Sequence, residues 1–492
     1  MKKIVLSLLV ISLFVKCSKE DHNAETIEIQ ELYSIQEINS YMESQIRELG
    51  DINWRDAEAK MLYSAVMHGG EVLSIGYGAE GESFSGNQKS PQLKAALENI
   101  KSVISQNELF QKSGEPQEDP ILNVIDVKIS NLETIESLLE TKHIRYLDPI
   151  GYNHFASANQ GYQQKNAGCD ELDEPINSKD VTNISPNALL PWNFSIHNIP
   201  QAWSQSTGAG VTVGIIDTGL TKNQALLNKN INNGESSGRS VQRFGTYIDS
   251  PWWWSKKTDG PEDRCGHGTQ MTAVLGAPRN NKGLPLGVAY NSNLVVYRGT
   301  ADVLLDDYHE RKGVSNALIE LANREDVKII SMSIGYLYSI GNIKDAVKYA
   351  YSKDKLIICA GGTSTTFTNW YGIIFPASMS ETVAVTGIKD NGYKRCDICH
   401  DGNMDFTIVM QRGNDASRNV PVIGFNTGTT RYSSGSSVAT AITSGIAALV
   451  WAKNPGFNRD QVLDKLKKSA EFYPRRDDKF GYGNLDALKA VQ

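Results

Sequence analysis

The chain has 492 residues, of which 40% are hydrophobic and 21% are charged, and its formal net charge is −7. This composition is typical of a globular protein. The length allows two or three domains, because a single core rarely grows past about 250–300 residues. The net negative charge implies no basic face, so no nucleic-acid partner is expected.

The N-terminus has the layout of a secretory signal peptide. Met1, Lys2 and Lys3 form a short basic start, and an apolar run over residues 4–15 follows. The run is too short to span a bilayer as an anchor, so residues 1–16 are predicted to be a removed signal. The protein is therefore expected to be exported.

Cys17 directly follows the apolar run and precedes a polar stretch at residues 18–21. This resembles a bacterial lipoprotein signal, in which the cysteine becomes the lipidated first residue, although Lys16 stands where a small residue is usual. The resemblance implies a membrane partner through a lipid anchor on Cys17, and a cell-envelope location at the outer membrane or cell surface. The alternative is an ordinary cleaved signal and a secreted protein.

Residues 17–150 are expected to form a small α+β domain, whose β-α-β unit at residues 121–147 is too small to be an independent enzyme. Apolar residues recur at helical intervals in some stretches and follow strand patterns in others. The predicted helices are 56–67, 93–110 and a short one that Asn131 caps and that runs to about 139; the predicted strands are 71–78, 121–129 and 143–147.

A linker is expected over residues 151–189, because this stretch is rich in Asn, Gln, Gly and Asp and has little periodicity. Proteolytic nicking concentrates in exposed polar segments of this kind. A maturation cut is therefore expected between about residues 150 and 195.

The last region, residues 190–492, alternates short β-branched runs with helical patterns. The runs that are apolar on both faces are 211–217, 293–298, 327–334, 356–360 and 382–386, and the helical patterns are 268–275, 314–323 and 342–353. This alternation predicts an α/β fold, with a parallel β-sheet flanked by helices on both sides. Reactive residues gather at the carboxyl ends of the strands in such sheets.

Two of the candidate reactive residues are Asp217 and His267. Asp217 ends a buried strand, where a carboxylate is costly unless a partner such as a histidine N–H offsets its charge. His267 lies between Gly266 and Gly268, which let a ligand or backbone approach the imidazole closely. Taken alone, Asp217 could cap a loop and His267 could be structural.

The third candidate is Ser437, at the start of a helix of small residues. A serine there is by default a cap. Catalytic use would need a base beside it, and the helix N-terminus would supply a positive dipole under an oxyanion.

The chain order Asp, His, Ser is the order found in subtilisin. The blocks Asp217-Thr-Gly, His267-Gly-Thr and Gly435-Ser-Ser437-Val-Ala resemble the three signature blocks of the subtilases, the peptidase S8 family. The likeness covers residues 190–492, with a weaker likeness of residues 121–149 to a subtilase propeptide. It implies a three-layer subtilisin-like catalytic domain preceded by a small α+β prodomain.

The resemblance implies a serine endopeptidase made as a zymogen, with peptide or protein substrates and its own propeptide as partners. Ser437 would attack the scissile carbonyl, His267 would move the proton and Asp217 would fix the imidazole tautomer. No cofactor is expected. Calcium is possible from the resemblance, but no acidic loop is specific enough to name, and no metal ligands are predicted.

Ser333, Ile334 and Gly335 resemble the backbone strand that pairs with an extended peptide substrate, and Gly361 is expected to bind substrate as well. The family usually places an oxyanion-donating Asn where this chain has Gly362. The oxyanion could instead be held by the N–H of Ser437 with water, or by the hydroxyl of Thr363 or Ser364.

Losing one such donor typically costs about 10²–10³ in rate. The gap at Gly362 leaves two other functions open. One is a catalytically weak or inactive subtilase that acts as a surface binding module, and the other is a processing peptidase with a narrow peptide substrate.

Beyond Cys17, five cysteines remain, and an exported protein can join them in one or two disulfides with one thiol left over. Cys396-Asp-Ile-Cys399-His400 matches the spacing of a haem attachment motif, but a disulfide or a loop metal site is favoured. Sequence alone does not give the pairing: Cys265 could pair with Cys396 or Cys399, and Cys359 is expected to be a buried free thiol. No partner is assigned to Cys169.

Three consecutive tryptophans, Trp252, Trp253 and Trp254, stand in an insertion before His267. Exposed aromatic residues often mark binding surfaces, so a substrate-facing lip is favoured over simple loop packing.

Overall fold

The computed structural model describes residues 31–84, 89–108, 115–154, 168–169, 173–363 and 372–492. The predicted signal peptide, the candidate lipidation residue Cys17 and the candidate oxyanion donor Ser364 lie outside the described residues. Residues from Tyr33 to Gln492 form one unit by their internal contacts.

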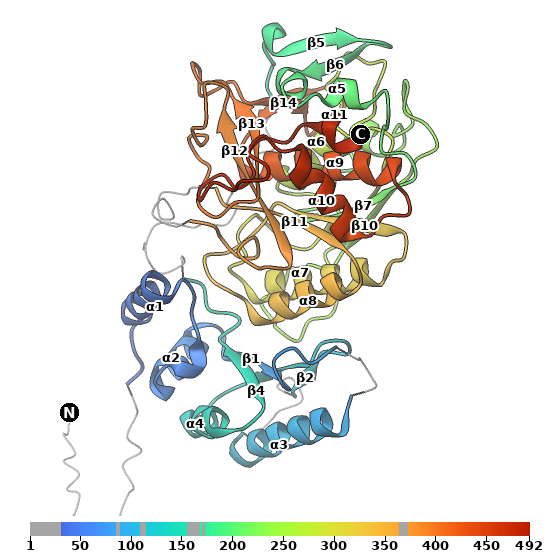
Figure 1. Cartoon of the computed structure of the whole chain (residues 1–492). Helices are drawn as coiled ribbons and strands as arrows, with labels where there is room; N and C mark the ends of the chain where they lie inside the picture. Colours follow the sequence, from blue (N-terminus) through green and yellow to red (C-terminus); the bar gives the residue numbers. More distant parts are fainter. Residues whose placement is uncertain (1–30, 85–88, 109–114, 155–167, 170–172, 364–371) are drawn as a thin grey trace, which may run out of the picture. The chain divides into compact units, whose positions relative to one another are not determined.

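The N-terminal region, residues 33–154, builds helices around a four-stranded antiparallel sheet with the strand order β2-β3-β1-β4 (Figure 1). Its elements are α1 (Ile35–Leu49), η1 (Trp54–Asp56), α2 (Ala59–His68), β1 (Val72–Tyr77), α3 (Pro91–Asn107), β2 (Gln117–Glu118), β3 (Val124–Lys128), α4 (Leu132–Glu140) and β4 (Ile144–Asp148). The predicted helices and strands of this region are confirmed to within a few residues.

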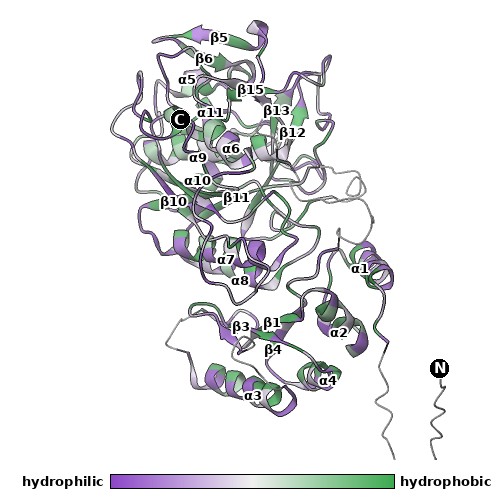
Figure 2. Ribbon diagram, turned by 180° about the vertical axis from the view of Figure 1, so that it is seen from behind, coloured by the Kyte–Doolittle hydropathy of each residue, from purple (hydrophilic) through white to green (hydrophobic). Residues whose placement is uncertain are grey.

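Helices α1 and α3 each show both hydrophilic and hydrophobic residues (Figure 2). Ile38, Met42 and Ile46 of α1 recur at intervals of four and are buried, so these apolar residues share one face of the helix. Asn131 occupies the N-cap position of α4, but its side chain makes no capping bond. Instead it donates to the carbonyl oxygen of Asn107 at 2.6 Å.

The second region contains a seven-stranded sheet with the order β13-β12-β11-β10-β7-β9-β8, and every neighbouring pair is parallel. Its strands are β7 (Thr212–Asp217), β8 (Val241–Gly245), β9 (Asn293–Arg298), β10 (Val327–Met332), β11 (Leu356–Ala360), β12 (Thr382–Lys389) and β13 (Phe406–Gln411). The predicted fold class is confirmed, although β8 and β13 were not predicted. Strands β7 and β11 are buried along their whole length, and β10 between them is buried except at Lys328, as expected of a sheet covered on both faces.

Helices cover both faces of this sheet (Figure 1). On one face lie α7 (Tyr308–Asn323) and α8 (Gly341–Ser352); on the other lie α6 (His267–Gly276), α9 (Gly435–Lys453) and α10 (Arg459–Ser469). Alternate residues of one strand pack against the helices on opposite faces, because successive strand side chains point in opposite directions. In β7, Val213 and Ile215 join one hydrophobic core and Ile216 joins the other.

Two hairpins and several short elements complete the second region. The hairpin strands are β5 (Val181–Ile184) with β6 (Ala188–Pro191), and β14 (Val420–Ile423) with β15 (Thr430–Ser433). The short elements are η2 (Ser178–Asp180), η3 (Trp192–Ser195), α5 (Ile199–Ala202), η4 (Ala225–Leu227) and α11 (Ala487–Val491). The β5–β6 hairpin lies across residue 189, where the expected linker ends.

Helix α9 is the one helix in the described part of the chain that is long and apolar enough to cross a membrane by length and composition. Of its most apolar window, 94% is buried inside the protein. It contacts β10, β11 and β12, so its apolar surface is covered by the sheet.

The N-terminal region and helices α7 and α8 share one hydrophobic core. Polar contacts border this shared core. Arg145 forms an ion pair with Asp345 at 2.7 Å, and Lys312 lies 3.0 Å from Asp126. Asp148 accepts a hydrogen bond from the N–H of Gly341, the first residue of α8, at 2.6 Å.

Candidate active site

The carboxyl end of β7 places Asp217 beside His267, the first residue of α6. The Asp217 side chain is fully buried, and its Oδ1 lies 2.7 Å from Nδ1 of His267. The same oxygen accepts the N–H of Thr218 at 2.8 Å. These two residues, 50 positions apart, therefore form the hydrogen-bonded pair of a base and the group that orients it.

The charge environment favours protonation of His267. Burial alone lowers the pKa of His267, but the negative charge and the hydrogen bond of Asp217 outweigh it, with a smaller contribution from Asp263. The result is a pKa of His267 above its ordinary value.

Asp263 holds the loop that leads into α6. Its Oδ1 accepts the N–H groups of Cys265 and Gly266, and its Oδ2 accepts the N–H and hydroxyl of Thr269. Gly266 adopts a φ of 91°, a left-handed conformation that glycine tolerates. Asp263 is not among the predicted site residues; an Asp followed within a few residues by glycine, before a helix, is the available signal.

Thr218 links the two sides of the pair. Its Oγ1 donates to Asp263 Oδ1 at 2.9 Å and accepts the N–H of Gly268 at 2.8 Å. Thr218, which follows Asp217, is thereby hydrogen-bonded both to the loop before His267 and to Gly268, the residue after His267. This network fixes the imidazole relative to the carboxylate.

Ser437 is the third residue of α9 and is almost completely buried. Its Oγ lies 3.4 Å from the carbonyl oxygen of Ser333, and its own carbonyl accepts the Ser333 hydroxyl at 3.1 Å. Among the hydrogen bonds of the described residues, none joins Ser437 Oγ to His267. Such bonds are often long in enzymes without substrate.

Helices α6 and α9 contact each other, which brings Ser437 and His267 onto neighbouring elements. A buried hydrogen bond of 2.8 Å from the Ser433 hydroxyl to Gln270 Oε1 reinforces this packing. Gln270 lies three residues after His267, and Ser433 lies four residues before Ser437. The bond therefore joins α6 to the end of β15, the strand that directly precedes α9.

The neighbouring serines differ from Ser437 in what their hydroxyls contact. The Ser436 hydroxyl accepts the N–H of Gly362 at 3.2 Å and shares a 3.1 Å hydrogen bond with Thr363 Oγ1. Ser434 is the N-cap residue of α9, and its side chain makes no capping bond. Gly362, at the expected oxyanion position, and Thr363, a predicted donor, are thus both hydrogen-bonded to Ser436 in this structure.

The position of Gly362 has no room for the side chain that the family usually carries there. Gly362 has a φ of 134°, and a Cβ added to it would lie 2.4 Å from Nδ1 of His400. His400 is fully buried, and its Nδ1 lies 2.7 Å from the carbonyl oxygen of Gly372. Burial lowers the pKa of His400, which favours the neutral imidazole. The imidazole of His400 thus fills the space beside Gly362.

Two of the predicted substrate-binding residues have their backbone groups paired inside the chain. The N–H of Gly335 donates to Val303 O at 3.1 Å, and the carbonyl of Gly335 accepts from Leu305 N at 3.3 Å. Gly361 donates to Val385 O at 2.9 Å and accepts from Ile374 N at 3.0 Å.

The disulfides are Cys169–Cys265 and Cys396–Cys399, and Cys359 is a buried free thiol. Cys265 therefore does not pair with Cys396 or Cys399, a pairing that the sequence left open. Cys396 and Cys399 instead close a tight turn on each other, with the N–H of Cys399 donating to Cys396 O at 3.1 Å. Both thiols are consumed in the disulfide, so neither can form the thioether that haem attachment requires.

The three tryptophans have different environments. Trp253 is buried in a small cluster with Val72, Ile150 and Tyr308. The Trp252 side chain is 57% exposed and stacks on Trp254, with 5.0 Å between ring centroids. Trp253, the central tryptophan, thus packs this insertion against the N-terminal region. This is the packing role, over which a substrate-facing lip was favoured.

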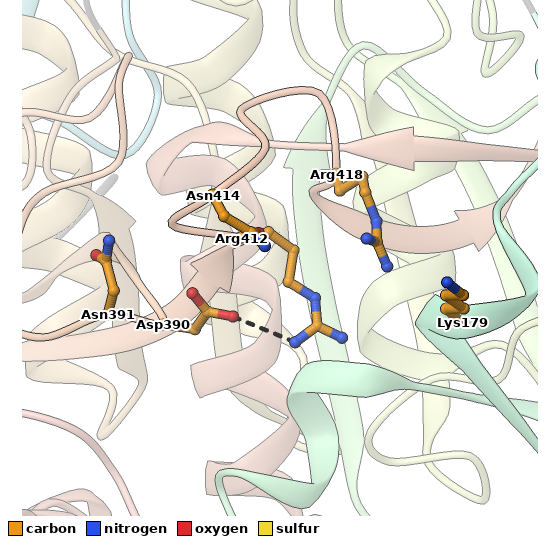
Figure 3. Close-up of a pocket in the computed structure, with 6 residues that line it drawn as sticks. All are labelled: Lys179, Asp390, Asn391, Arg412, Asn414 and Arg418. Atoms are coloured by element: carbon orange, nitrogen blue, oxygen red, sulfur yellow. Dashed lines mark hydrogen bonds and ion pairs between the residues drawn. The ribbon is translucent and has the colours of Figure 1, made fainter.

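A separate pocket of about 510 Å³ lies away from these residues (Figure 3). It is lined by Lys179, Asp390, Asn391, Arg412, Asn414 and Arg418. Arg412 bonds Asp390 at 3.2 Å, and both arginines also pair with the buried Asp180. Within the described ranges, no group of three or more His, Cys, Asp or Glu side chains is arranged to hold a metal ion.

The sequence profile of the Subtilase family, Peptidase_S8, matches residues 208–483, which is more than half of the chain. The chain belongs to the subtilase family. It is a serine-type endopeptidase.

Bacterial proteases align with 60% or more of this chain. Thermitase of Thermoactinomyces vulgaris is 25% identical over 296 residues, which cover 60% of this chain and 92% of thermitase. A thermostable alkaline protease of Halalkalibacterium halodurans is 26% identical over 315 residues, covering 63% of this chain and 75% of that protease. The crystal structure of MycP1 from Mycobacterium smegmatis matches at 19% identity and a TM-score of 0.48, covering 65% of this chain and 89% of that one.

Proposed function

We propose that this subtilase is exported and hydrolyses peptide bonds through an acyl-enzyme formed on Ser437. The observation that carries the proposal is the buried 2.7 Å hydrogen bond between Asp217 and His267, on elements that adjoin the helix of Ser437. A carboxylate paired with an imidazole next to a serine hydroxyl is the arrangement that activates a serine nucleophile.

In the proposed reaction, Nε2 of His267 accepts the proton of Ser437 Oγ as that oxygen attacks the scissile carbonyl. Asp217 holds the Nδ1–H of the imidazole, so Nε2 is the nitrogen left free to accept a proton. The protonated His267 then gives its proton to the leaving amine. Water attacks the acyl-enzyme in the second half of the reaction and regenerates Ser437.

The N–H of Ser437 is proposed as the first oxyanion donor. Ser437 is the third residue of α9, and the N–H groups of a first helical turn have no partner within their helix. The positive end of the helix dipole adds to the stabilisation. Thr363 is proposed as the second donor through its hydroxyl, if substrate displaces the hydrogen bond to Ser436.

The experiment that tests this function is labelling of the purified protein with a fluorophosphonate, followed by mass mapping of the adduct. The expected result is one adduct on Ser437, together with hydrolysis of fluorescein-labelled casein that the label abolishes. An adduct on Ser433, Ser434 or Ser436, or no adduct at all, would contradict the proposal.

The raised pKa of His267 predicts the pH dependence of hydrolysis. His267 must be neutral to accept the proton of Ser437, so kcat/KM should fall as the pH drops through a midpoint above about 6.5, the usual histidine value. Replacing Asp217 by Asn removes the charge that raises this pKa, and the midpoint should move to lower pH. A wild-type midpoint below 6.5, or one that the substitution leaves in place, would contradict this assignment.

Export is supported by the two disulfides of the described residues, because such bonds persist in oxidising compartments and are rare in the cytosol. We propose lipid anchoring on Cys17 as the mode of attachment. Intact-mass analysis of membrane-extracted protein would show a lipid-modified Cys17 at the N-terminus, whereas a plain secreted protein would begin without one.

We also propose that the N-terminal region, residues 33–154, is a propeptide and that the mature enzyme keeps Cys169 and the residues after it. The carboxylate of Asp173 accepts the N–H of Phe425 at 2.8 Å. Asp180 is fully buried and accepts from Arg418 at 2.7 Å and from the Tyr432 hydroxyl at 2.6 Å. These contacts fix residues 173–180 to residues 418–432, beside the pocket of Figure 3.

This proposal predicts how the cleaved chain separates on a gel. If the cut precedes Cys169, the propeptide fragment should separate from the mature chain without reductant, because the Cys169–Cys265 bond then lies within the mature chain. Non-reducing electrophoresis with mass mapping of the mature N-terminus measures this. Fragments that separate only after reduction would place the cut after Cys169 and contradict the prediction.

A further inference from the structure

Residues 333–335 form an extension of strand β10 that is expected to pair with substrate. Another part of the same chain is already paired with this extension. Residues 303–305, named here the closing segment, make both backbone hydrogen bonds of Gly335, through Val303 O and Leu305 N. Leu304 lies opposite Gly335 as a parallel bridge partner. A peptide that adds a strand to an edge needs unpaired N–H and C=O groups on that edge.

The other edge of the same extension is also covered. Tyr336 donates its N–H to Phe375 O at 2.9 Å, and Phe375 donates its N–H to Tyr336 O at 3.0 Å. The backbone N–H and C=O groups of Gly335 and Tyr336 are therefore hydrogen-bonded to other segments of the same chain, one on each edge. A peptide can pair with Gly335 only after the closing segment moves.

Three contacts hold the closing segment in place. The Leu305 side chain is fully buried. The N–H of Leu304 donates to Asp302 Oδ1 at 2.8 Å, and the carbonyl oxygen of Leu305 accepts from Nε of Arg311 at 2.9 Å. Arg311 is on α7 and is itself 2% exposed.

The same guanidinium also holds the end of the N-terminal region. Nη1 of Arg311 donates to Ile150 O at 2.6 Å, and Nη2 donates to Tyr152 O at 3.0 Å. The planar fork of arginine presents these donors in one fixed geometry. One side chain therefore bonds both the closing segment and the last residues of the N-terminal region.

We propose that Arg311 is a positioning residue that keeps the substrate edge closed for as long as the N-terminal region is in place. Departure of that region would remove the acceptors Ile150 O and Tyr152 O from a buried charge, which is costly unless water or a new partner replaces them. Arg311 would then turn to solvent and release Leu305, and Gly335 would become available to a peptide. The inference rests on the proposed function for the identity of that peptide as a substrate.

Hydrogen–deuterium exchange tests the coupling in the full chain carrying Ser437→Ala, which cannot cleave itself. The amides of Leu305 and Gly335 should be protected, and Arg311→Met should speed their exchange roughly tenfold or more, since a hydrogen bond from a charged group contributes at that level. Arg311→Lys, which keeps the charge but not the fork, should give a smaller increase. The amides of β7 report whether each variant is folded.

Lys312→Met is the matched control. Lys312 is the next residue of α7 and binds Asp126 of the N-terminal region, but its ion pairs do not involve the closing segment. The Lys312→Met substitution should weaken the contact with the N-terminal region without changing the exchange rates of the Leu305 and Gly335 amides beyond a factor of about two. Equal effects of the Lys312 and Arg311 variants, or rapid exchange at Gly335 in the parent chain, would overturn the proposal.

A second measurement uses chains with Ser437 intact and not yet processed. The fluorophosphonate needs only the serine and its base, whereas casein needs the peptide edge as well. Arg311→Lys should leave the rate of labelling unchanged and raise the initial rate of casein hydrolysis per labelled site. An unchanged casein rate would overturn the role of Arg311. Absence of labelling in every chain would instead count against the proposed function. The exchange data would still test the role of Arg311 independently.

Discussion

Ser437→Ala is expected to lower kcat for casein hydrolysis by about 10⁶ and to abolish fluorophosphonate labelling. The substitution removes one oxygen atom, so neither the attack on the carbonyl nor the covalent adduct can form. Among the described residues Ser437 Oγ has one hydrogen bond, a long 3.4 Å contact with Ser333 O, so its loss should cost little stability. Measured kcat, labelling and thermal unfolding of the variant check these three statements.

Ser434→Ala is the matched control for this experiment. Ser434 carries a hydroxyl three residues away, and its side chain makes no capping bond to α9. Its loss should leave labelling and kcat within a few-fold of the wild type. If the Ser437→Ala enzyme retains labelling, the nucleophile is another serine.

Asp217→Asn is expected to lower kcat by about 10⁴ while leaving the fold intact. The Asn amide would place an N–H against Nδ1 of His267, where Asp217 Oδ1 now lies at 2.7 Å. The imidazole would then carry its proton on Nε2 and could not accept the proton of Ser437. The N–H of Thr218 bonds the same Oδ1 at 2.8 Å, so the amide N–H would remove this hydrogen bond as well, and the unfolding temperature should fall modestly.

Glu262→Gln is the control for a lost carboxylate charge close to the site. Glu262 accepts the N–H of Lys222 and binds Arg243, and among the described residues none of its hydrogen bonds reaches His267. Its kcat should stay within a few-fold of the wild type. If Asp217→Asn loses less than tenfold in kcat, Asp217 does not set the tautomer of His267.

The sequence placed the elements of the second region well because its signals are local. Continuous apolar runs predicted β7, β9, β10, β11 and β12, and all of them are strands of one parallel sheet. The two missed strands lie at the edges of that sheet. β8 alternates half-buried and exposed residues, so it lacks the apolar run that identifies a central strand.

Several parts of the candidate site could not be predicted because they depend on contacts between distant residues. Cys169 pairs with Cys265 across 96 positions, and no local pattern distinguishes this pairing from the others. Asp263 organises the loop before His267 only because Thr218, 45 positions earlier, comes to lie against it. The imidazole of His400 fills the space beside Gly362, which accounts for the missing Asn through packing.

The sequence by itself determined that Asp217 ends a strand and that His267 begins a helix, with Ser437 in the first turn of another. These positions follow from short apolar runs and from flanking glycines and small residues, which act over a few residues. Only the tertiary structure decided that Asp217 and His267 are hydrogen-bonded, and that Gly335 is already paired with residues 303–305. Backbone groups have no residue-specific signature, so which strand edge is open or closed depends on how the whole chain packs.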